Sequence, residues 1–319
     1  GDRIVGVDTA STRGWTTAQV SAGLKGRPGT QVKARFFRPG VPQPFEVEFT
    51  RRTIRIPAIP FSLMLEEKTA YIPLQQFNET TTREFSETLR RLEAEGAKGV
   101  VLDLRRNTGG FLDQALQLTN FFVPRGKELA TVRGREGPPQ RYLAEVDPIA
   151  PTIPMVILTD GYSASASEIV AGALQDHDRA LSGGTTSFGK GLVQSVYQLD
   201  GGYAIKLTTG KWYTPSGRSI QKERHLDGNG NYVEVTPDSL ETDAVRLARP
   251  QFKSDGGRVV YGGGAITPDV IVPYDTLSSA EQKLARALVP RSQDVYLVLD
   301  DYAFTLKGSI APDFKVGAS

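Results

Sequence analysis

The stretch from Met155 to Ile169, which reads MVILTDGYSASASEI, gives the strongest indication of the fold. Its first four residues are apolar and predict a buried strand, and a helix is expected over 165–175 after a run of small residues. A second buried strand is predicted over 99–104, between helices over 80–95 and 110–122. This alternation of strands and helices indicates an α/β domain with a largely parallel core sheet.

The segments on either side of this domain have a different pattern. Residues 1–52 predict a unit that is too small to hold a stable core alone. Its strands are expected over 4–7, 31–38 and 45–50, and its helix over 16–24. Residues 53–274 form the α/β domain, in which 222–264 are expected to be loops and a hairpin. Residues 275–319 predict two helices, over 278–288 and 292–306, whose apolar side chains are expected to pack on the core rather than on a second subunit.

The composition excludes several kinds of chemistry. The 319 residues include no cysteine and only two histidines, so disulfides, thiolate nucleophiles and His-rich metal sites are not expected. The 38 basic and 36 acidic residues leave a formal charge of +2, which gives no reason to expect a nucleic acid as partner. The sequence also lacks the run of about 18 apolar residues that predicts a membrane-spanning helix. We therefore expect no metal and no cofactor.

Ser165 stands where a serine nucleophile is useful. At the start of the expected helix, N–H groups without intrahelical partners could face a developing oxyanion. A helix-capping serine fits the same position, and on spacing alone capping is the more frequent role. A nucleophile also needs a base. His177 follows twelve residues later, which is about three helical turns at roughly 1.5 Å per residue, and nothing in the sequence brings His225 close.

Lysine is the other base that serine nucleophiles use. Lys190 is flanked by two glycines, which suits a pocket, although most lysines are exposed charges. A lysine near its ordinary pKa of about 10.4 is protonated at neutral pH, so burial would have to lower that pKa by several units. The turn LDLRRNTGG over 102–110 offers a third element, because Gly109 and Gly110 could either start a helix or donate N–H groups to an oxyanion.

Together these segments resemble the carboxyl-terminal processing proteases, or tail-specific proteases, a family of serine peptidases with a Ser/Lys dyad. The family places its nucleophile 25 residues before its lysine, which is the spacing of Ser165 and Lys190. It places a supporting glutamine four residues after the lysine, where Gln194 stands. The resemblance covers about residues 1–275, with further matching segments over 211–217 and 262–269.

The resemblance implies a role for each site residue. Ser165 is the nucleophile, Lys190 is the general base, and Gln194 holds the lysine amine without adding charge. Two backbone N–H groups hold the oxyanion, those of Ala166 and of Gly109 or Gly110. Thr108 and Ser187 depart from the residues most frequent in the family, but neither position supplies a catalytic group. The implied substrates are proteins or peptides with exposed C-termini, and no metal or cofactor takes part.

The resemblance also implies the domain order and the location. The α/β domain becomes a ClpP/crotonase-like catalytic core, residues 1–52 the second half of a PDZ domain, and residues 275–319 a helical tail. The first half of the PDZ domain, with its carboxylate-binding loop, is absent from this sequence, and a membrane anchor could also lie outside it. The family works in the bacterial cell envelope, and a homo-oligomer or a regulatory partner could be involved.

Three other interpretations stay open. A non-catalytic carrier of lipophilic ligands can share this core, although it predicts the loss of the serine or the lysine. A crotonase-like acyl-CoA enzyme uses similar strand–turn–helix units but does not require the Ser/Lys/Gln spacing. A latent, PDZ-gated form of the peptidase is the third. Four apolar residues are candidates for a substrate pocket, with core packing expected for each: Phe61, Leu63, Met64 and Phe111.

Overall fold

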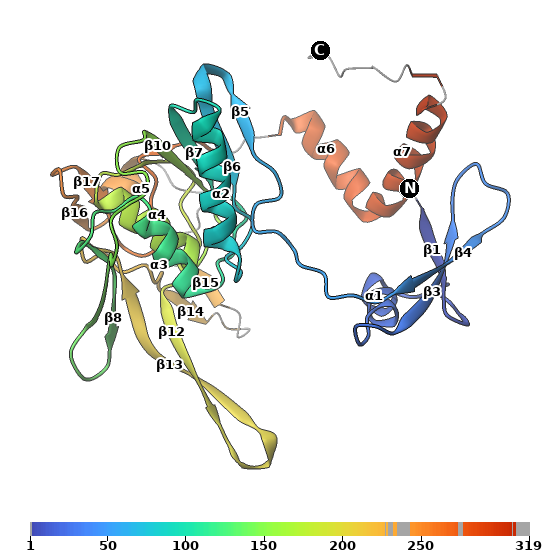
Figure 1. Cartoon of the computed structure of the whole chain (residues 1–319), viewed down its shortest axis with the longest axis horizontal. Helices are drawn as coiled ribbons and strands as arrows, with labels where there is room; N and C mark the ends of the chain where they lie inside the picture. Colours follow the sequence, from blue (N-terminus) through green and yellow to red (C-terminus); the bar gives the residue numbers. More distant parts are fainter. Residues whose placement is uncertain are drawn as a thin grey trace. The chain divides into compact units, whose positions relative to one another are not determined.

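The computed structural model describes residues 2–226, 228, 232–234, 243–273, 277–307 and 309–310. The chain forms two compact units (Figure 1). One unit combines Gly1–Arg55 with Asp275–Ser319, and the other is Ile56–Tyr274. Each is described by itself below. The mixed α/β architecture expected from the sequence is confirmed.

The larger unit is built on a six-stranded sheet of order β18-β11-β10-β7-β6-β5. Its central strands pair in parallel, as predicted, and only the edge strand β5 runs antiparallel to its neighbour. The apolar runs of β7 and β10 lie side by side, with Leu102 opposite Ile157. The strands are β5 (Leu63–Leu65), β6 (Thr69–Pro73), β7 (Gly99–Asp103), β10 (Met155–Thr159), β11 (Leu181–Gly184) and β18 (Val270–Ile271).

Three helices contribute to the core around this sheet: α2 (Thr81–Ala94), α3 (Leu112–Asn120) and α4 (Ala166–Asp176). In α2, the predicted stripe of Phe85, Leu89 and Leu92 is buried. Every residue of α4 is buried, which its many small side chains allow because neighbouring elements can approach from all sides. The start of α4 therefore has a fixed position in the core.

A second, antiparallel sheet of order β12-β13-β8-β9 belongs to the same unit. Its strands are β8 (Glu128–Gly134), β9 (Gln140–Leu143), β12 (Leu192–Gln198) and β13 (Ala204–Tyr213). One hairpin was expected in 222–264, and the structure has two hairpins there. The first pairs β14 (Arg224–Leu226) with β15 (Tyr232–Glu234), and the second pairs β16 (Gln251–Lys253) with β17 (Val259–Tyr261). A short helix, α5 (Asp243–Leu247), was not expected. Part of the predicted loop, 229–231 and 235–242, lies outside the described residues.

The smaller unit holds a four-stranded antiparallel sheet of order β2-β1-β3-β4. Its elements are β1 (Arg3–Val7), β2 (Ala10–Ser11), α1 (Thr17–Leu24), β3 (Gln31–Phe37), β4 (Phe45–Thr50), α6 (Ser279–Leu288) and α7 (Ser292–Lys307). Arg3 of β1 pairs with Asp301 of α7 at 3.7 Å. None of the residues in α6 and α7 is buried. The expectation that their apolar side chains pack on the core of the α/β domain concerns the other unit and stays a prediction.

A buried ion pair anchors the far end of α4. Arg218 and Asp176 are each about 1% exposed and bond to each other, and Arg218 also donates to Gln175 Oε1 at 2.9 Å. Removing the arginine would leave a buried carboxylate without its charge partner. We expect Arg218→Met to lower the free energy of unfolding by about 3–5 kcal/mol in urea denaturation.

Arg141 provides the matched control, because it pairs with Glu128 at 2.6 Å but is 64% exposed. Arg141→Met should change the free energy of unfolding by about 1 kcal/mol at most. Equal losses in the two variants would contradict the structural importance of the buried pair.

Candidate active site

Ser165 lies immediately before α4, at the end of the turn that follows β10. Its backbone has φ 57° and ψ −113°, a conformation that non-glycine residues rarely adopt. The Ser165 N–H donates to Glu168 Oε2 at 2.8 Å, which holds this unusual turn. The residue is partly exposed, whereas its neighbours Ala164 and Ala166 are buried. A reactant could therefore reach the Ser165 hydroxyl at the N-terminus of a helix.

The two serines on either side of Ser165 have structural partners. Ser163 and Ser167 are fully buried, and their hydroxyls donate to the carbonyl oxygens of Leu104 at 2.8 Å and Asn107 at 2.9 Å. The two serines thus fasten the α4 turn to the 103–110 turn. Of the three serines in the SASAS pattern, only Ser165 remains partly exposed.

The two glycines of the 103–110 turn differ in their hydrogen bonds. The Gly109 N–H donates to Asn107 Oδ1 at 2.9 Å, so this donor is already engaged. Within the described part of the chain, no acceptor bonds the N–H of Gly110 or of Ala166. A Cβ added to Gly109 would lie 2.7 Å from the Ala164 carbonyl oxygen and 2.9 Å from Ser165 Cβ. Gly109 therefore permits close contact with the serine turn, and two N–H groups are left open.

Glu168 joins the serine turn to the segment that carries Lys190. It is fully buried, and Oε2 accepts the N–H of Ser165 and the N–H of Lys190, both at 2.8 Å. Oε1 accepts the Gly189 N–H and the Ser187 hydroxyl, both at 2.6 Å. Complete burial raises the pKa of the Glu168 carboxyl above its ordinary value, although the four donors act in the opposite direction.

The sequence analysis did not assign a role to Glu168. Glu168 stands three residues after Ser165, the residue that precedes α4. A glutamate at this position commonly accepts the N–H of the residue before the helix. No local pattern indicates the three donors at positions 187, 189 and 190, because the fold brings them there.

A second buried carboxylate holds the start of the 103–110 turn. Asp103 accepts the Tyr71 hydroxyl at 2.6 Å and pairs with Arg105 at 2.7 Å. Burial alone would raise the pKa of Asp103, but the hydrogen bonds from Arg105 and Tyr71 outweigh it and keep this pKa below its ordinary value. The sequence analysis did not single out Tyr71.

Lys190 and Gln194 are both exposed, Lys190 before β12 and Gln194 within it. The expected burial of Lys190 is not found. No hydrogen bond connects the side chains of Ser165, Lys190 and Gln194 within the residues that the structure describes. The backbone around Lys190 is nevertheless fixed. The Lys222 N–H donates to the Gly189 carbonyl at 3.1 Å, and the Gly191 N–H donates to Gln221 Oε1 at 3.0 Å.

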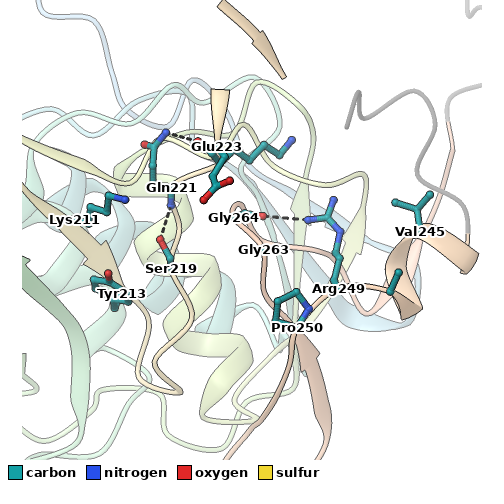
Figure 2. A pocket seen from close by; sticks show the side chains of 12 residues that line it. Lys211, Tyr213, Ser219, Gln221, Glu223, Val245, Arg249, Pro250, Gly263 and Gly264 are labelled. Atoms are coloured by element: carbon teal, nitrogen blue, oxygen red, sulfur yellow. Dashed lines mark hydrogen bonds between the residues drawn. The ribbon is translucent and has the colours of Figure 1, made fainter. Parts of the chain in front are cut away.

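A cavity of about 660 Å³ lies beside this segment, with Gln221 and Lys222 in its wall (Figure 2). Figure 2 shows the Arg249 guanidinium turned toward the Gly264 carbonyl, to which Nη1 donates at 3.3 Å. The lining residues do not include Ser165, Lys190 or Gln194, so the cavity is a neighbour of the candidate site rather than its substrate pocket.

Histidine and metal chemistry find no support in the described part of the chain. His177 follows the last residue of α4, at the end opposite Ser165, and lies 2.9 Å from Asp255 and 2.6 Å from the Glu128 carbonyl. The side chain of His225 is outside the described residues. Among those described, no three His, Asp or Glu residues cluster as metal ligands would. In the same residues, no helix has both the length and the apolar composition for crossing a membrane.

The apolar candidates for a substrate pocket do not behave as expected. Phe61, Leu63 and Phe111 are 50%, 49% and 55% exposed, so core packing is wrong for these three. Met64 is partly buried and packs against the core, as expected. Phe111 directly follows Gly110, and it is therefore next in sequence to one of the two open N–H groups.

A serine at a helix N-terminus beside two open N–H groups is an arrangement suited to acyl transfer. A model of Peptidase family S41 matches residues 68–239, more than half of the chain, and the chain belongs to this family. The family expected from the three motifs is thus confirmed.

Two curated relatives and one solved structure illustrate the similarity. The chain is 39% identical to a carboxy-terminal-processing protease of Bartonella bacilliformis over 69% of this chain and 51% of that protein. It is 36% identical to the carboxy-terminal processing protease CtpA of Bacillus subtilis over 70% of this chain and 47% of that protein. The photosystem II D1 C-terminal processing protease aligns with a TM-score of 0.51 and 26% identity, over 90% of this chain and 67% of that one. The chain spans about half the length of the curated relatives it matches.

Proposed function

We propose that this protein is a serine endopeptidase that cleaves proteins at or near their C-termini, with Ser165 as nucleophile and Lys190 as general base. The observation that carries the proposal is the bridge made by Glu168, whose Oε2 accepts the N–H groups of both residues at 2.8 Å. One buried oxygen thereby fixes the backbones of the serine and the lysine relative to each other.

The chemistry follows from this arrangement. Ser165 Oγ attacks the scissile carbonyl and forms the acyl–oxygen bond, while Lys190 Nζ takes the hydroxyl proton and passes it to the leaving amine. The N–H groups of Gly110 and Ala166 hold the oxyanion, since the Gly109 N–H is engaged with Asn107. Water then attacks the acyl-enzyme with Lys190 again as base. Gln194 orients the lysine amine.

The exposure of Lys190 and Gln194 favours a second candidate, a latent form of the same peptidase. A lysine amine that faces water stays hydrated. A bound substrate segment would therefore have to cover Lys190 before it acts as a base. The non-catalytic carrier has less support, because the serine and the lysine are both present at the spacing that the family requires.

The substrates and the setting are proposed from the names of the relatives. Carboxy-terminal processing implies protein substrates with exposed C-termini. From the resemblance of the motifs to the family, we also propose an extracytoplasmic location in the bacterial envelope. Residues 1–52 would be the second half of a PDZ domain that presents the substrate tail, and 53–274 a ClpP/crotonase-like core. We assign no nucleic acid, metal or cofactor to the reaction.

Product analysis tests the proposal. The chain is incubated with an unstructured protein, and fragments are identified by mass spectrometry. We expect peptides released from the C-terminal region by the wild type and none by Ser165→Ala. Equal cleavage by the variant would refute the proposal. A delay before cleavage that shortens after preincubation with substrate would identify the latent form.

Gly109 offers a test of the close contact beside Ser165. With φ +97° and the Ala164 and Ser165 atoms within 3 Å of an added Cβ, Gly109→Ala should displace the two turns and lower kcat by roughly 10²-fold. Gly126 has a similar φ of +84° but no atom within 4 Å of an added Cβ. Gly126→Ala should therefore keep kcat while costing about 1–2 kcal/mol of stability. Similar kcat values in both variants would argue against the contact.

A further inference from the structure

Asp160 accepts hydrogen bonds from both turns of the candidate site. It follows β10 directly and is only 4% exposed. Its Oδ1 atom accepts the N–H groups of Tyr162 at 3.0 Å and Ser163 at 3.1 Å, in the turn that leads to Ser165. The same atom accepts the Arg106 N–H at 2.9 Å, from the turn that leads to the two glycines. One carboxylate oxygen thus joins segments that lie 54 residues apart in the sequence.

The bond to Arg106 supports an unfavourable backbone conformation. Arg106 has φ +61°, a left-handed conformation that is strained for a residue with a side chain. Its side chain is exposed, and two backbone hydrogen bonds hold the turn: the Asn107 N–H donates to the Leu104 carbonyl at 3.1 Å, and the Arg106 N–H donates to Asp160. Asn107, the next residue, is fully buried and accepts the Gly109 N–H at 2.9 Å. The conformation at Arg106 therefore sets the direction of the chain toward Gly110.

We propose that Asp160 is a positioning residue of the peptidase, which holds the turn at Arg106 so that the Gly110 N–H faces the reacting carbonyl beside Ser165. This inference rests on the proposed function. Displacing an oxyanion donor weakens the binding of the transition state more than the binding of the substrate. The loss therefore appears in kcat rather than in KM.

The hydrogen-bond pattern allows a conservative substitution. All the recorded bonds to the Asp160 side chain end on Oδ1, and within the described residues no donor bonds Oδ2. An asparagine can place its amide oxygen at Oδ1 and its NH₂ group at Oδ2, which keeps all three acceptor contacts. An alanine removes them together.

The test compares Asp160→Ala with Asp160→Asn in peptide hydrolysis. We expect the alanine variant to lose about 10–10²-fold in kcat with KM within about twofold, and the asparagine variant to keep kcat within about threefold. Wild-type kcat in the alanine variant would overturn the proposal. So would an asparagine variant that falls as far as the alanine variant.

A second substitution covers the case in which Asp160→Ala folds poorly. Glycine adopts φ +61° without strain, so Arg106→Gly should keep the turn in place without the carboxylate. The double variant Asp160→Ala/Arg106→Gly should recover at least about fivefold in kcat over Asp160→Ala. If the double variant folds but its kcat does not recover, the proposal that Asp160 acts through the conformation of Arg106 is overturned. Cleavage by Ser165→Ala would instead refute the proposed function, whatever the result at Asp160.

Discussion

Alanine in place of Lys190 should lower the turnover of a peptide substrate by about 10³-fold or more. His177 cannot take the Ser165 proton in place of Lys190, because it lies at the opposite end of α4. The fold should not change. The Lys190 side chain is exposed and makes no hydrogen bond within the described residues, so the free energy of unfolding should move by about 0.5 kcal/mol at most. Turnover and urea unfolding are measured on the same preparation.

Two variants separate proton transfer from charge. Lys190→Arg keeps the positive charge but cannot release a proton, so it should be as inactive as the alanine variant. Lys206 is an exposed lysine of β13, in the antiparallel sheet that follows Lys190, and Lys206→Ala should keep wild-type turnover. An active Lys190→Arg variant would mean that the residue acts through its charge alone.

Glu168→Gln should lower kcat by about 10²-fold and also destabilise the fold. Both carboxylate oxygens of Glu168 accept two donors each, from the serine turn and from the segment over 187–190. A glutamine replaces one oxygen by an NH₂ group, which would face two donors. Each buried donor left without an acceptor costs about 1–3 kcal/mol. Steady-state kinetics and urea unfolding should therefore both show the loss.

The comparison with other carboxylates makes this result specific. Glu87 on α2 is 62% exposed and pairs only loosely with Arg83, at 3.7 Å, so Glu87→Gln should be silent in both measurements. Asp160→Asn should also be tolerated, because only one oxygen of Asp160 is used. A fully active and fully stable Glu168→Gln variant would show that the four contacts do not hold the two segments together.

The sequence predicted those features that depend on local pattern. The spacing of Phe85, Leu89 and Leu92 placed the buried face of α2, and the apolar runs at β7 and β10 predicted buried strands of a largely parallel sheet. Most of the antiparallel sheet was missed. Strands such as β8 and β12 mix polar and apolar residues without a clear alternation, and the pairing that joins the two hairpins, β8 with β13, links segments that are distant in the sequence.

The candidate site was predictable only in part, for a related reason. Motif spacing indicates that Ser165 and Lys190 belong to one site, but it does not show how their backbones are joined through Glu168. Burial is another collective property. The apolar side chains of α6 and α7 form a stripe, but a stripe alone does not show which part of the chain covers it.

The SASAS pattern around Ser165 contains three serines that the local sequence does not distinguish. A repeat of two residues looks the same after a shift of two, so Ser163 or Ser167 could in principle occupy the reactive place. The surroundings remove this symmetry. Of the three serine hydroxyls, the Leu104 and Asn107 carbonyls accept the outer two, those of Ser163 and Ser167. Asp160 and Glu168 lie at opposite ends of the pattern and accept N–H groups there. The proposed nucleophile is thus distinguished by unequal neighbours rather than by its own side chain, and moving the serines alone would not relocate the proposed reaction.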